Sequence, residues 1–205
     1  MIYQSNIQSL IEGYCQFKNK YFEQNNIYEN LVQNGQKPKA LVIACCDSRV
    51  DPAIITNCDP GDLFVVRNVA NLIPPFSNDT AHHSIHAALK FGILNLNIKN
   101  IIVLGHSHCG GICSLMNGNH DAWMEIAMPA KQEVLIKYPN HSPDEQKRLC
   151  EQTSLIMSLN NLKTFPWIKE RVLANELFLH AWYFDLATGV IKTYDLSCDK
   201  FTELK

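Results

Sequence analysis

The sequence lacks three features that would point to a membrane or to a nucleic acid. No apolar run approaches the roughly 20 residues that a membrane-spanning helix needs. The first residues, from Met1 to Asn6, show no basic region followed by an apolar one, as a secretory leader would. Basic charge is not in excess, because 18 Lys and Arg residues stand against 20 Asp and Glu residues. We therefore expect a cytoplasmic protein with no membrane and no nucleic-acid partner.

Internal repeats, low-complexity tracts and linkers are also missing from the 205 residues, which predicts a single domain spanning 1–205. Cysteine, by contrast, is plentiful. The eight cysteines are spread along a chain without a leader, which is not the pattern of a disulfide framework. In a reducing cytoplasm, cysteines clustered with histidine usually mark a metal site or catalysis, and scattered ones are small buried apolar residues.

Short apolar runs that alternate with helical patterns predict an α/β fold with a mainly parallel central sheet of about five strands. The expected strands span 40–45, 63–67, 100–104, 177–184 and 190–194. Helices are expected at 79–92, capped by Asp79, near 111–117, and over most of 120–173. A Thr-Gly turn at 188–189 makes the last two strands a hairpin, so an edge of the sheet is antiparallel, and helices cover both faces.

Residues 1–35 carry apolar side chains at three- and four-residue spacings, which is the pattern of an amphipathic helix. These side chains are Ile7, Leu10, Ile11, Tyr14, Phe17 and Phe22. Asn34-Gly35 provides a helix stop. Two interpretations remain open: this helical segment packs on its own domain, or it is an arm that packs on a partner subunit.

Two of the expected strands end in residues that bind soft or borderline metals. Cys45 ends the first strand, and His106 and Cys109 follow the third. Right-handed crossovers can place these strands side by side, so that their carboxyl ends meet. Two thiolates and one imidazole suit Zn²⁺ and leave a fourth position open, which favours a catalytic site over a structural one. Each residue alone would be an ordinary structural residue, and only the combination predicts a metal.

The alternative ligands are the nearby residues Cys46 and His108. Strand alternation puts Cys45, Asp47 and Arg49 on one side, so Cys46 is expected to point into the core. The spacing alone does not decide between the two histidines.

Asp47 and Arg49 are expected to form an ion pair beside the metal site. An arginine can hold a carboxylate through two parallel hydrogen bonds. The pair would keep Asp47 ionised, ready to accept a hydrogen bond from a zinc-bound water, and unable to swing onto the metal. A purely structural ion pair is the simpler alternative.

At these residues the sequence resembles the β-class carbonic anhydrases. The stretch from Ala44 to Val50 is similar to the family's Cys-x-Asp-x-Arg signature, and that from Gly105 to Gly111 to its His-x-x-Cys-Gly-Gly signature. Residues 60–71 are similar to the segment that the family has between the two, and the resemblance extends from about Gly35 to Tyr194.

The resemblance implies one Zn²⁺ per subunit, bound by Cys45, His106 and Cys109, with Asp47 and Arg49 as the catalytic pair. The substrate pocket that it implies contains Gln36, Phe64, Val69 and the backbone N–H of Gly110. It also implies a homodimer or a dimer-based higher oligomer in which the N-terminal helices embrace the neighbour. That favours the interpretation of residues 1–35 as an arm.

The expected function is that of a lyase, the reversible hydration of carbon dioxide to bicarbonate and a proton by a zinc-bound hydroxide. The first alternative is a hydrolase of CS₂ or COS on the same zinc scaffold. The second is a zinc-binding regulatory or interaction module, which predicts a blocked fourth position or a lost Asp–Arg pair. The presence of Asp47 and Arg49 argues against it.

Some members of the family carry a second, inhibitory bicarbonate site formed by a Trp, an Arg and a Tyr. Here Val42 and Phe184 stand at the Trp and Tyr positions, and only Arg67 remains. We therefore expect the plant-like, non-allosteric subgroup.

The helix that lines the pocket departs from the plant-like pattern. His82, His86 and Ala87 stand where a Gly, a Glu and a Tyr are usual. Together with His83, the histidines either relay protons, since imidazole titrates near neutrality, or are partly buried polar residues at a subunit contact.

Overall fold

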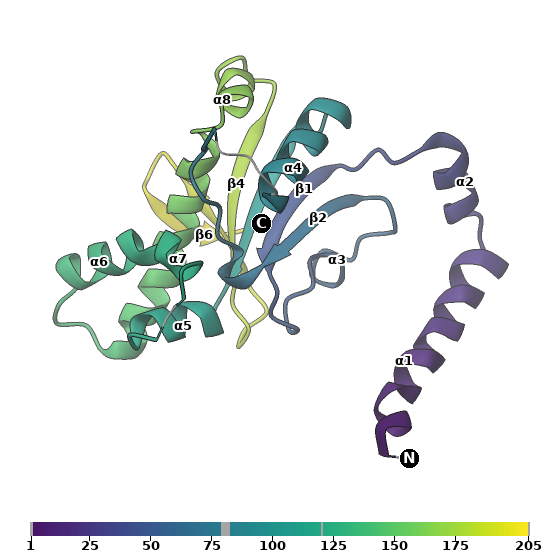
Figure 1. Ribbon diagram of the computed structural model, residues 1–205, viewed down its shortest axis with the longest axis horizontal. Coiled ribbons are helices and arrows are strands. Elements are labelled where there is room, and N and C mark those ends of the chain that lie inside the picture. The colour runs from purple at the N-terminus through teal and green to yellow at the C-terminus, as the bar shows by residue number, and fades with distance from the viewer. Residues whose placement is uncertain (1, 79–82, 120, 205) are drawn as a thin grey trace.

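A computed structural model of the protein describes residues 2–78, 83–119 and 121–204 (Figure 1). Its centre is a six-stranded sheet with the order β2-β1-β3-β4-β5-β6. The strands are β1 (Ala40–Cys45), β2 (Leu63–Asn68), β3 (Asn100–His106), β4 (Phe178–Phe184), β5 (Ile191–Asp195) and β6 (Lys200–Glu203). The α-helices are α1 (Ile2–Lys18), α2 (Ile27–Asn34), α3 (Pro52–Ile55), α4 (Ser84–Lys90), α5 (Gly110–Met116), α6 (Met128–Lys137), α7 (Pro143–Leu162) and α8 (Pro166–Leu173).

The pairing of the strands confirms the predicted α/β fold with a mainly parallel sheet. β1 pairs in parallel with both β2 and β3, and β3 pairs in parallel with β4. β5 and β6 then continue the sheet in antiparallel fashion. The first and third strands of the chain are therefore neighbours, as expected from right-handed crossovers.

Three elements differ from the sequence-based expectation by more than one residue. The strand β6, with its short and charged sequence Lys-Phe-Thr-Glu, was not predicted. β3 extends to His106 because β4 is long enough to pair with it through Phe184, so His106 lies in a strand and not in a loop. The helix expected at 79–92 contains α4, which passes into a wider turn at Phe91–Asn95. Asp79, its expected cap, lies outside the described residues.

The two faces of the sheet carry separate apolar clusters because side chains alternate along each strand. On one face, Leu41, Ile43, Ile101 and Val103 pack with residues of α4, α7 and α8. The other face carries a smaller cluster of Ala40, Val42, Ala44, Ile102 and Leu104, against which Ile55 of α3 packs. A glycine at position 105 lets α7 approach β3, since a Cβ there would lie 2.8 Å from Leu155 Cδ1.

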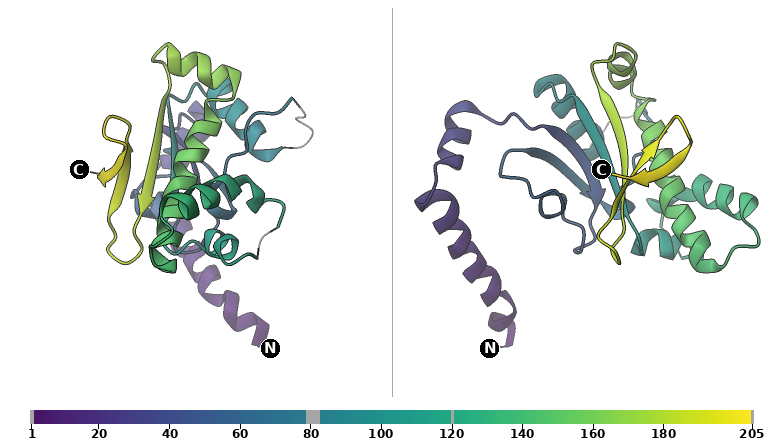
Figure 2. Two further views of the ribbon diagram at one scale, coloured as in Figure 1. Left: turned by 90° about the vertical axis from the view of Figure 1, so that its left-hand side faces the viewer. Right: turned by 180° about the vertical axis from the view of Figure 1, so that it is seen from behind.

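The helix α1 extends away from the sheet in every view (Figures 1 and 2). Four of its apolar side chains follow the i, i+3, i+4, i+7 spacing of one helix face. The exposed fractions are 51% for Ile7, 70% for Leu10, 48% for Ile11 and 61% for Tyr14. Within one chain, this apolar face therefore has no cover.

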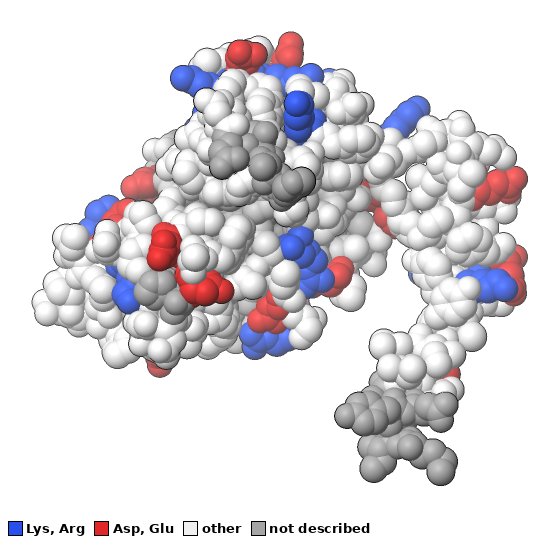
Figure 3. Space-filling view, in the orientation of Figure 1, with Lys and Arg blue, Asp and Glu red and all other residues white. Residues whose placement is uncertain are grey.

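The surface gives no sign of a single dominant charge. On the face shown in Figure 3, Lys and Arg side chains are interspersed with Asp and Glu. Among the residues that the structure describes, no helix combines the length and the apolar character needed to cross a membrane.

Candidate metal centre

Three side chains from two adjacent strands and the following helix start meet at the carboxyl edge of the sheet. Cys45 ends β1, His106 ends β3, and Cys109 immediately precedes α5. Their candidate ligand atoms all lie within 4.8 Å of one another, and the Sγ atoms of Cys45 and Cys109 are 4.0 Å apart. A tetrahedral zinc site with ordinary Zn–S bonds separates two sulfurs by about 3.8 Å, so the cluster has the dimensions that Zn²⁺ requires.

The imidazole of His106 is oriented for a metal. Its Nδ1 lies 2.9 Å from the carbonyl oxygen of Ser107, which fixes the tautomer with the proton on Nδ1. Its Nε2 is buried and has no hydrogen-bond partner within the described chain. A buried nitrogen with a free lone pair is costly unless something binds it. The donor set of two sulfurs and one nitrogen, with this unpartnered atom, fits Zn²⁺.

The two thiols influence each other strongly. Contact with the Cys109 thiol, aided by His106 and opposed by burial, lowers the pKa of Cys45. Contact with Cys45, together with burial, raises the pKa of Cys109. The pair therefore gives up its first proton easily and its second only with difficulty. A divalent cation bound between the sulfurs would favour loss of both protons, so metal binding should release protons.

The neighbouring residues Cys46 and His108 are not part of the cluster. Both side chains are exposed. The expectation that Cys46 points into the core is wrong, because β1 ends at Cys45 and the alternation of the strand does not continue beyond it. His108 has a left-handed backbone, with a φ of 58°, in the turn between β3 and α5.

Asp47 and Arg49 form the predicted ion pair beside the cluster. Arg49 donates through Nε to Asp47 Oδ1 at 2.9 Å and through Nη2 to Oδ2 at 2.6 Å. The backbone N–H of Arg49 also donates to Oδ1, at 3.0 Å. The guanidinium lowers the pKa of Asp47 well below its usual range. Asp47 Oδ2 lies 3.9 Å from Nε2 of His106, so an ionised carboxylate borders the candidate metal position.

A residue that the sequence analysis did not assign to this site, Arg67, holds the loop that carries the pair. Its guanidinium donates to the carbonyl oxygens of Cys45 at 3.0 Å and Asp47 at 2.7 Å, and to the carboxylate of Asp51 at 3.1 Å. The sequence feature that could have identified Arg67 is its place as a single arginine at the end of β2, which lies directly beside β1 in the sheet.

The residues expected to form a substrate pocket fall into two groups. Val69 directly follows Asn68, which is paired with Cys45 in the sheet. Val69 also lies close to the start of α5, since a Cβ on Gly111 would be 2.9 Å from Val69 Cγ1. Val69 and Gly110 therefore lie at the metal edge of the sheet. Phe64, in contrast, is paired with Leu41 near the start of β1, and Gln36 lies before that strand. Four residues of strand span about 13 Å, so one chain does not bring Phe64 and Gln36 to its own cluster.

Neither His83 nor His86 belongs to the cluster of Cys45, His106 and Cys109. His86 packs among the rings of Phe76, Phe165 and Trp167, with its centroid 5.1 Å from that of Trp167. Burial lowers its pKa. His83 is exposed at the start of α4, and His82 lies outside the described residues. The relay and the subunit-contact interpretations of these histidines both stay predictions.

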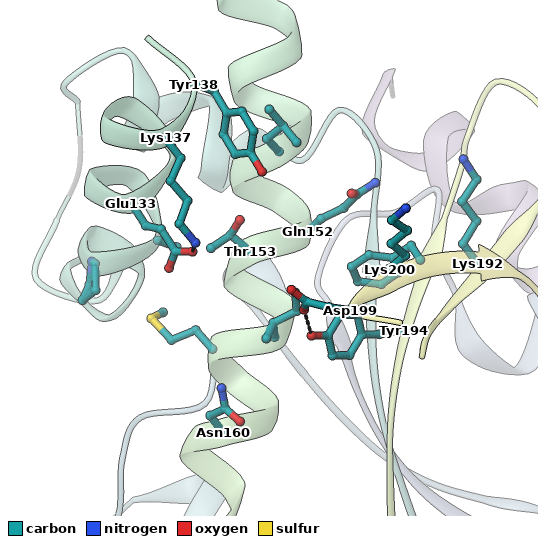
Figure 4. A pocket seen from close by; sticks show the side chains of 16 residues that line it. Glu133, Lys137, Tyr138, Gln152, Thr153, Asn160, Lys192, Tyr194, Asp199 and Lys200 are labelled. Atoms are coloured by element: carbon teal, nitrogen blue, oxygen red, sulfur yellow. Dashed lines mark hydrogen bonds and ion pairs between the residues drawn. The ribbon is translucent and has the colours of Figure 1, made fainter. Parts of the chain in front are cut away.

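Two cavities border the helix α7. The larger, of about 670 Å³, lies between α6, α7 and the β5–β6 hairpin, and no residue of the metal cluster lines it. In Figure 4, Glu133 and Lys137 of α6 lie on one side of it, and the hydrogen-bonded pair of Tyr194 and Asp199 on the other. The second cavity, of about 570 Å³, reaches the metal edge and is lined in part by Ser107, Gly110, Glu151 and Tyr183.

Comparisons with known proteins agree on one family. Residues 40–191 match the family model described as carbonic anhydrase. Over 200 residues, the chain is 36% identical to β carbonic anhydrase 3 of Arabidopsis thaliana, covering 93% of this chain and 77% of that protein. It spans only 58% and 60% of the length of two further β carbonic anhydrases of the same plant.

Solved structures extend the agreement to the fold. The β-carbonic anhydrase CcaA matches with a TM-score of 0.90 and 34% identity, covering 98% of this chain and 93% of the other. One of two tetrameric β-carbonic anhydrases from Sordaria macrospora matches with a TM-score of 0.78 and 25% identity, covering 94% of this chain and 97% of the other.

Proposed function

The chain belongs to the β-carbonic anhydrase family, and on that premise we propose that it catalyses the reversible hydration of carbon dioxide to bicarbonate and a proton at a zinc ion, one per chain. Cys45, His106 and Cys109 would hold the metal. The observation that carries the proposal is the convergence of these three ligand atoms beside an ionised aspartate held by Arg49.

A zinc ion held by these residues would act as a Lewis acid that activates water as the nucleophile near neutral pH. Asp47 supplies the acceptor on the open side of the cluster, where its Oδ2 can hold a proton-bearing oxygen in a fixed orientation. Arg49 occupies both carboxylate oxygens with hydrogen bonds, which restrains the carboxylate from turning toward the metal. Val69, which is 48% exposed, offers an apolar surface that suits carbon dioxide.

We further propose that a second copy of the chain completes the pocket. Gln36 and Phe64 lie toward the opposite end of β1 from Cys45, and Gln36 is exposed. A neighbouring subunit that brings this end against the metal edge would supply an amide for the product oxygens and an aromatic wall. The arm of residues 1–35 would hold the two subunits together through the apolar face of α1. The tetrameric relatives from Sordaria macrospora are consistent with a dimer-based assembly of this kind.

Disrupting the arm tests the assembly. We expect Leu10→Asp, at the most exposed position of the apolar face of α1, to shift the protein toward monomers, because a carboxylate buried at an apolar contact loses several kcal/mol of solvation. Sedimentation velocity on the purified full chain measures the change. Gln8→Asp, on a different face of the same helix, is the matched control and should keep the native state. An unchanged oligomer in Leu10→Asp would contradict the arm.

We also propose the non-allosteric subgroup and a cytoplasmic location. Val42 is 2% exposed and apolar, and the guanidinium of Arg67 is occupied by the loop that carries Asp47. These residues offer little to a second bicarbonate ion. A cytoplasmic location would keep the ligand thiols reduced.

The function is tested by stopped-flow hydration of carbon dioxide with the zinc-loaded full chain. We expect rapid acidification that depends on zinc content. Release of H₂S from CS₂ and from COS is measured in parallel on the same preparation. Hydration of carbon dioxide well above the rates with CS₂ and COS supports the proposal. The absence of hydration in protein with one zinc per chain would refute it, and H₂S release in that case would favour the hydrolase.

A further inference from the structure

We propose that Glu151 and Tyr183 form a positioning pair that fixes the backbone of the zinc ligand Cys109 and thereby sets the metal affinity of the site. The inference rests on the zinc site of the proposed function. Neither residue was a candidate from the sequence motifs, and both lie on elements that contribute no metal ligand.

Glu151 is an unusual residue for its surroundings. It is 6% exposed, and no other Asp or Glu is as buried among the residues that the structure describes. No Lys or Arg of the described chain forms an ion pair with it. A carboxyl group that is removed from water without a cation must be stabilised by hydrogen bonds. The donors that bind its two oxygens therefore indicate the role of Glu151.

One of these oxygens binds the metal loop directly. The backbone N–H of Cys109 donates to Glu151 Oε1 at 2.9 Å. Cys109 stands at the junction between the ligand strand and α5, with an extended backbone at φ −67° and ψ 119°. A buried hydrogen-bond acceptor on its N–H fixes the orientation of that peptide unit, and the direction of the Cα–Cβ bond follows from it. The position of Sγ is therefore tied to Glu151.

The other oxygen connects Glu151 to the sheet. The hydroxyl of Tyr183 donates to Oε2 at 2.7 Å, and this side chain is 1% exposed. Tyr183 lies on β4 and is paired in register with Gly105, the residue before His106. The same interaction thus links Cys109 to the strand that is the direct neighbour of the His106 strand.

Close packing on both sides makes the link rigid. Leu155 lies one helical turn after Glu151, and its Cδ1 would lie only 2.8 Å from a Cβ placed on Gly105. Glu151 and Leu155 therefore face β3 together and hold α7 against the ligand strand. Partners that orient metal ligands in this way typically change metal affinity by ten- to a hundredfold when they are replaced.

The experiment measures zinc affinity of the full chain by competition with a chromophoric chelator, without any substrate. We expect Glu151→Gln to weaken zinc binding by about ten- to a hundredfold, because the amide can accept only one of the two hydrogen bonds and turns an N–H₂ group toward the other donor. We expect Tyr183→Phe to weaken it by about three- to tenfold. The double variant should bind zinc no more weakly than Glu151→Gln alone, because the two residues act through one link.

Two further measurements separate positioning from general destabilisation. Ser158→Ala removes another buried polar group of α7, which accepts the N–H of Ile73 at 3.3 Å, and should lower the melting temperature while zinc affinity stays within twofold. Cobalt-loaded Glu151→Gln should show altered visible absorption bands at saturating metal, since these bands report ligand geometry.

Zinc affinities of Glu151→Gln and Tyr183→Phe that both stay within twofold of the native value would overturn the proposal, as would additive effects in the double variant. If Glu151→Gln does not fold, the conservative Tyr183→Phe decides alone. Because no substrate is present, failure of carbon dioxide hydration in the native protein would leave these affinities interpretable. Unchanged affinities would in turn leave the proposed reaction untouched.

Discussion

We expect the variant Cys109→Ala to lose its zinc and its carbon dioxide hydration together. The cluster has three ligand atoms within the described chain, and removing one sulfur leaves only Cys45 and His106. Two ligands neither neutralise the ion nor define a tetrahedral site. The zinc content after desalting should fall from one per chain to a small fraction. The hydration rate should fall by more than about a hundredfold, because replacing a residue that only hydrogen-bonds to a metal ligand already costs up to about a hundredfold. Atomic absorption and stopped-flow assays measure the two quantities.

The chain offers a matched control for this substitution. Cys113 lies one turn further along α5, is half-buried and outside the cluster, and accepts a weak hydrogen bond from Asn117 at 3.6 Å. Cys113→Ala should keep full zinc and activity. Cys46→Ala is a second control, for the end of β1. It removes the exposed thiol next to Cys45 and should also keep full zinc and activity. One zinc per chain in Cys109→Ala, with activity intact, would show that the ligand set is wrong.

The metal centre could be predicted from the sequence because its determinants are local. An uninterrupted apolar run marks a parallel strand that is buried on both faces, so β1 was predicted with its observed bounds. The residue that follows such a run lies at the carboxyl edge. Handedness then makes β1 and β3 neighbours, and two strand ends become one site.

An error and an open alternative appeared where the decisive pairing could not be read from the local sequence. Cys46 was expected in the core because strand alternation was continued past the last residue that pairs. The choice between His106 and His108 depended on how far β3 extends, which is set by its pairing with β4 more than seventy residues further along the sequence. Glu151 could have been noticed, because it occupies an apolar position of α7, four and eight residues before the buried Leu155 and Leu159.

Gln36 and Phe64 could not be assigned to the site from the fold of a single chain. The positions of Gln36 before β1 and of Phe64 near the start of β2 follow from the sequence, but within a single chain both residues lie far from the cluster. Only a resemblance to a family of oligomers joined them to the site. An exposed apolar face on α1 is the feature, within one chain, that favours the proposed partner subunit.

We expect Asp47→Asn to retain one zinc per chain while kcat/KM for carbon dioxide falls by about a hundredfold, within the range for loss of a positioned proton acceptor. Asp47 accepts three hydrogen bonds from Arg49 with its two oxygens. An asparagine has one oxygen, so its N–H₂ group takes the place of either Oδ1 or Oδ2, and both oxygens accept from Arg49. In either orientation Arg49 loses a hydrogen bond, and with N–H₂ in the place of Oδ2 the acceptor beside His106 also becomes a donor. Metal analysis and stopped-flow kinetics on the same sample test the prediction.

The control is a carboxylate in another ion pair. Glu133 pairs with Lys137 at 2.6 Å on α6, away from the cluster and from the start of β1, so Glu133→Gln should leave kcat/KM within twofold. Arg49→Lys then distinguishes the two roles of the pair. A lysine keeps the positive charge but cannot make two parallel hydrogen bonds, so Asp47 stays ionised yet becomes free to turn. If orientation is what Arg49 supplies, Arg49→Lys loses nearly as much activity as Asp47→Asn while zinc remains. If charge alone matters, it keeps most of its activity, and the proposed restraint on Asp47 is wrong.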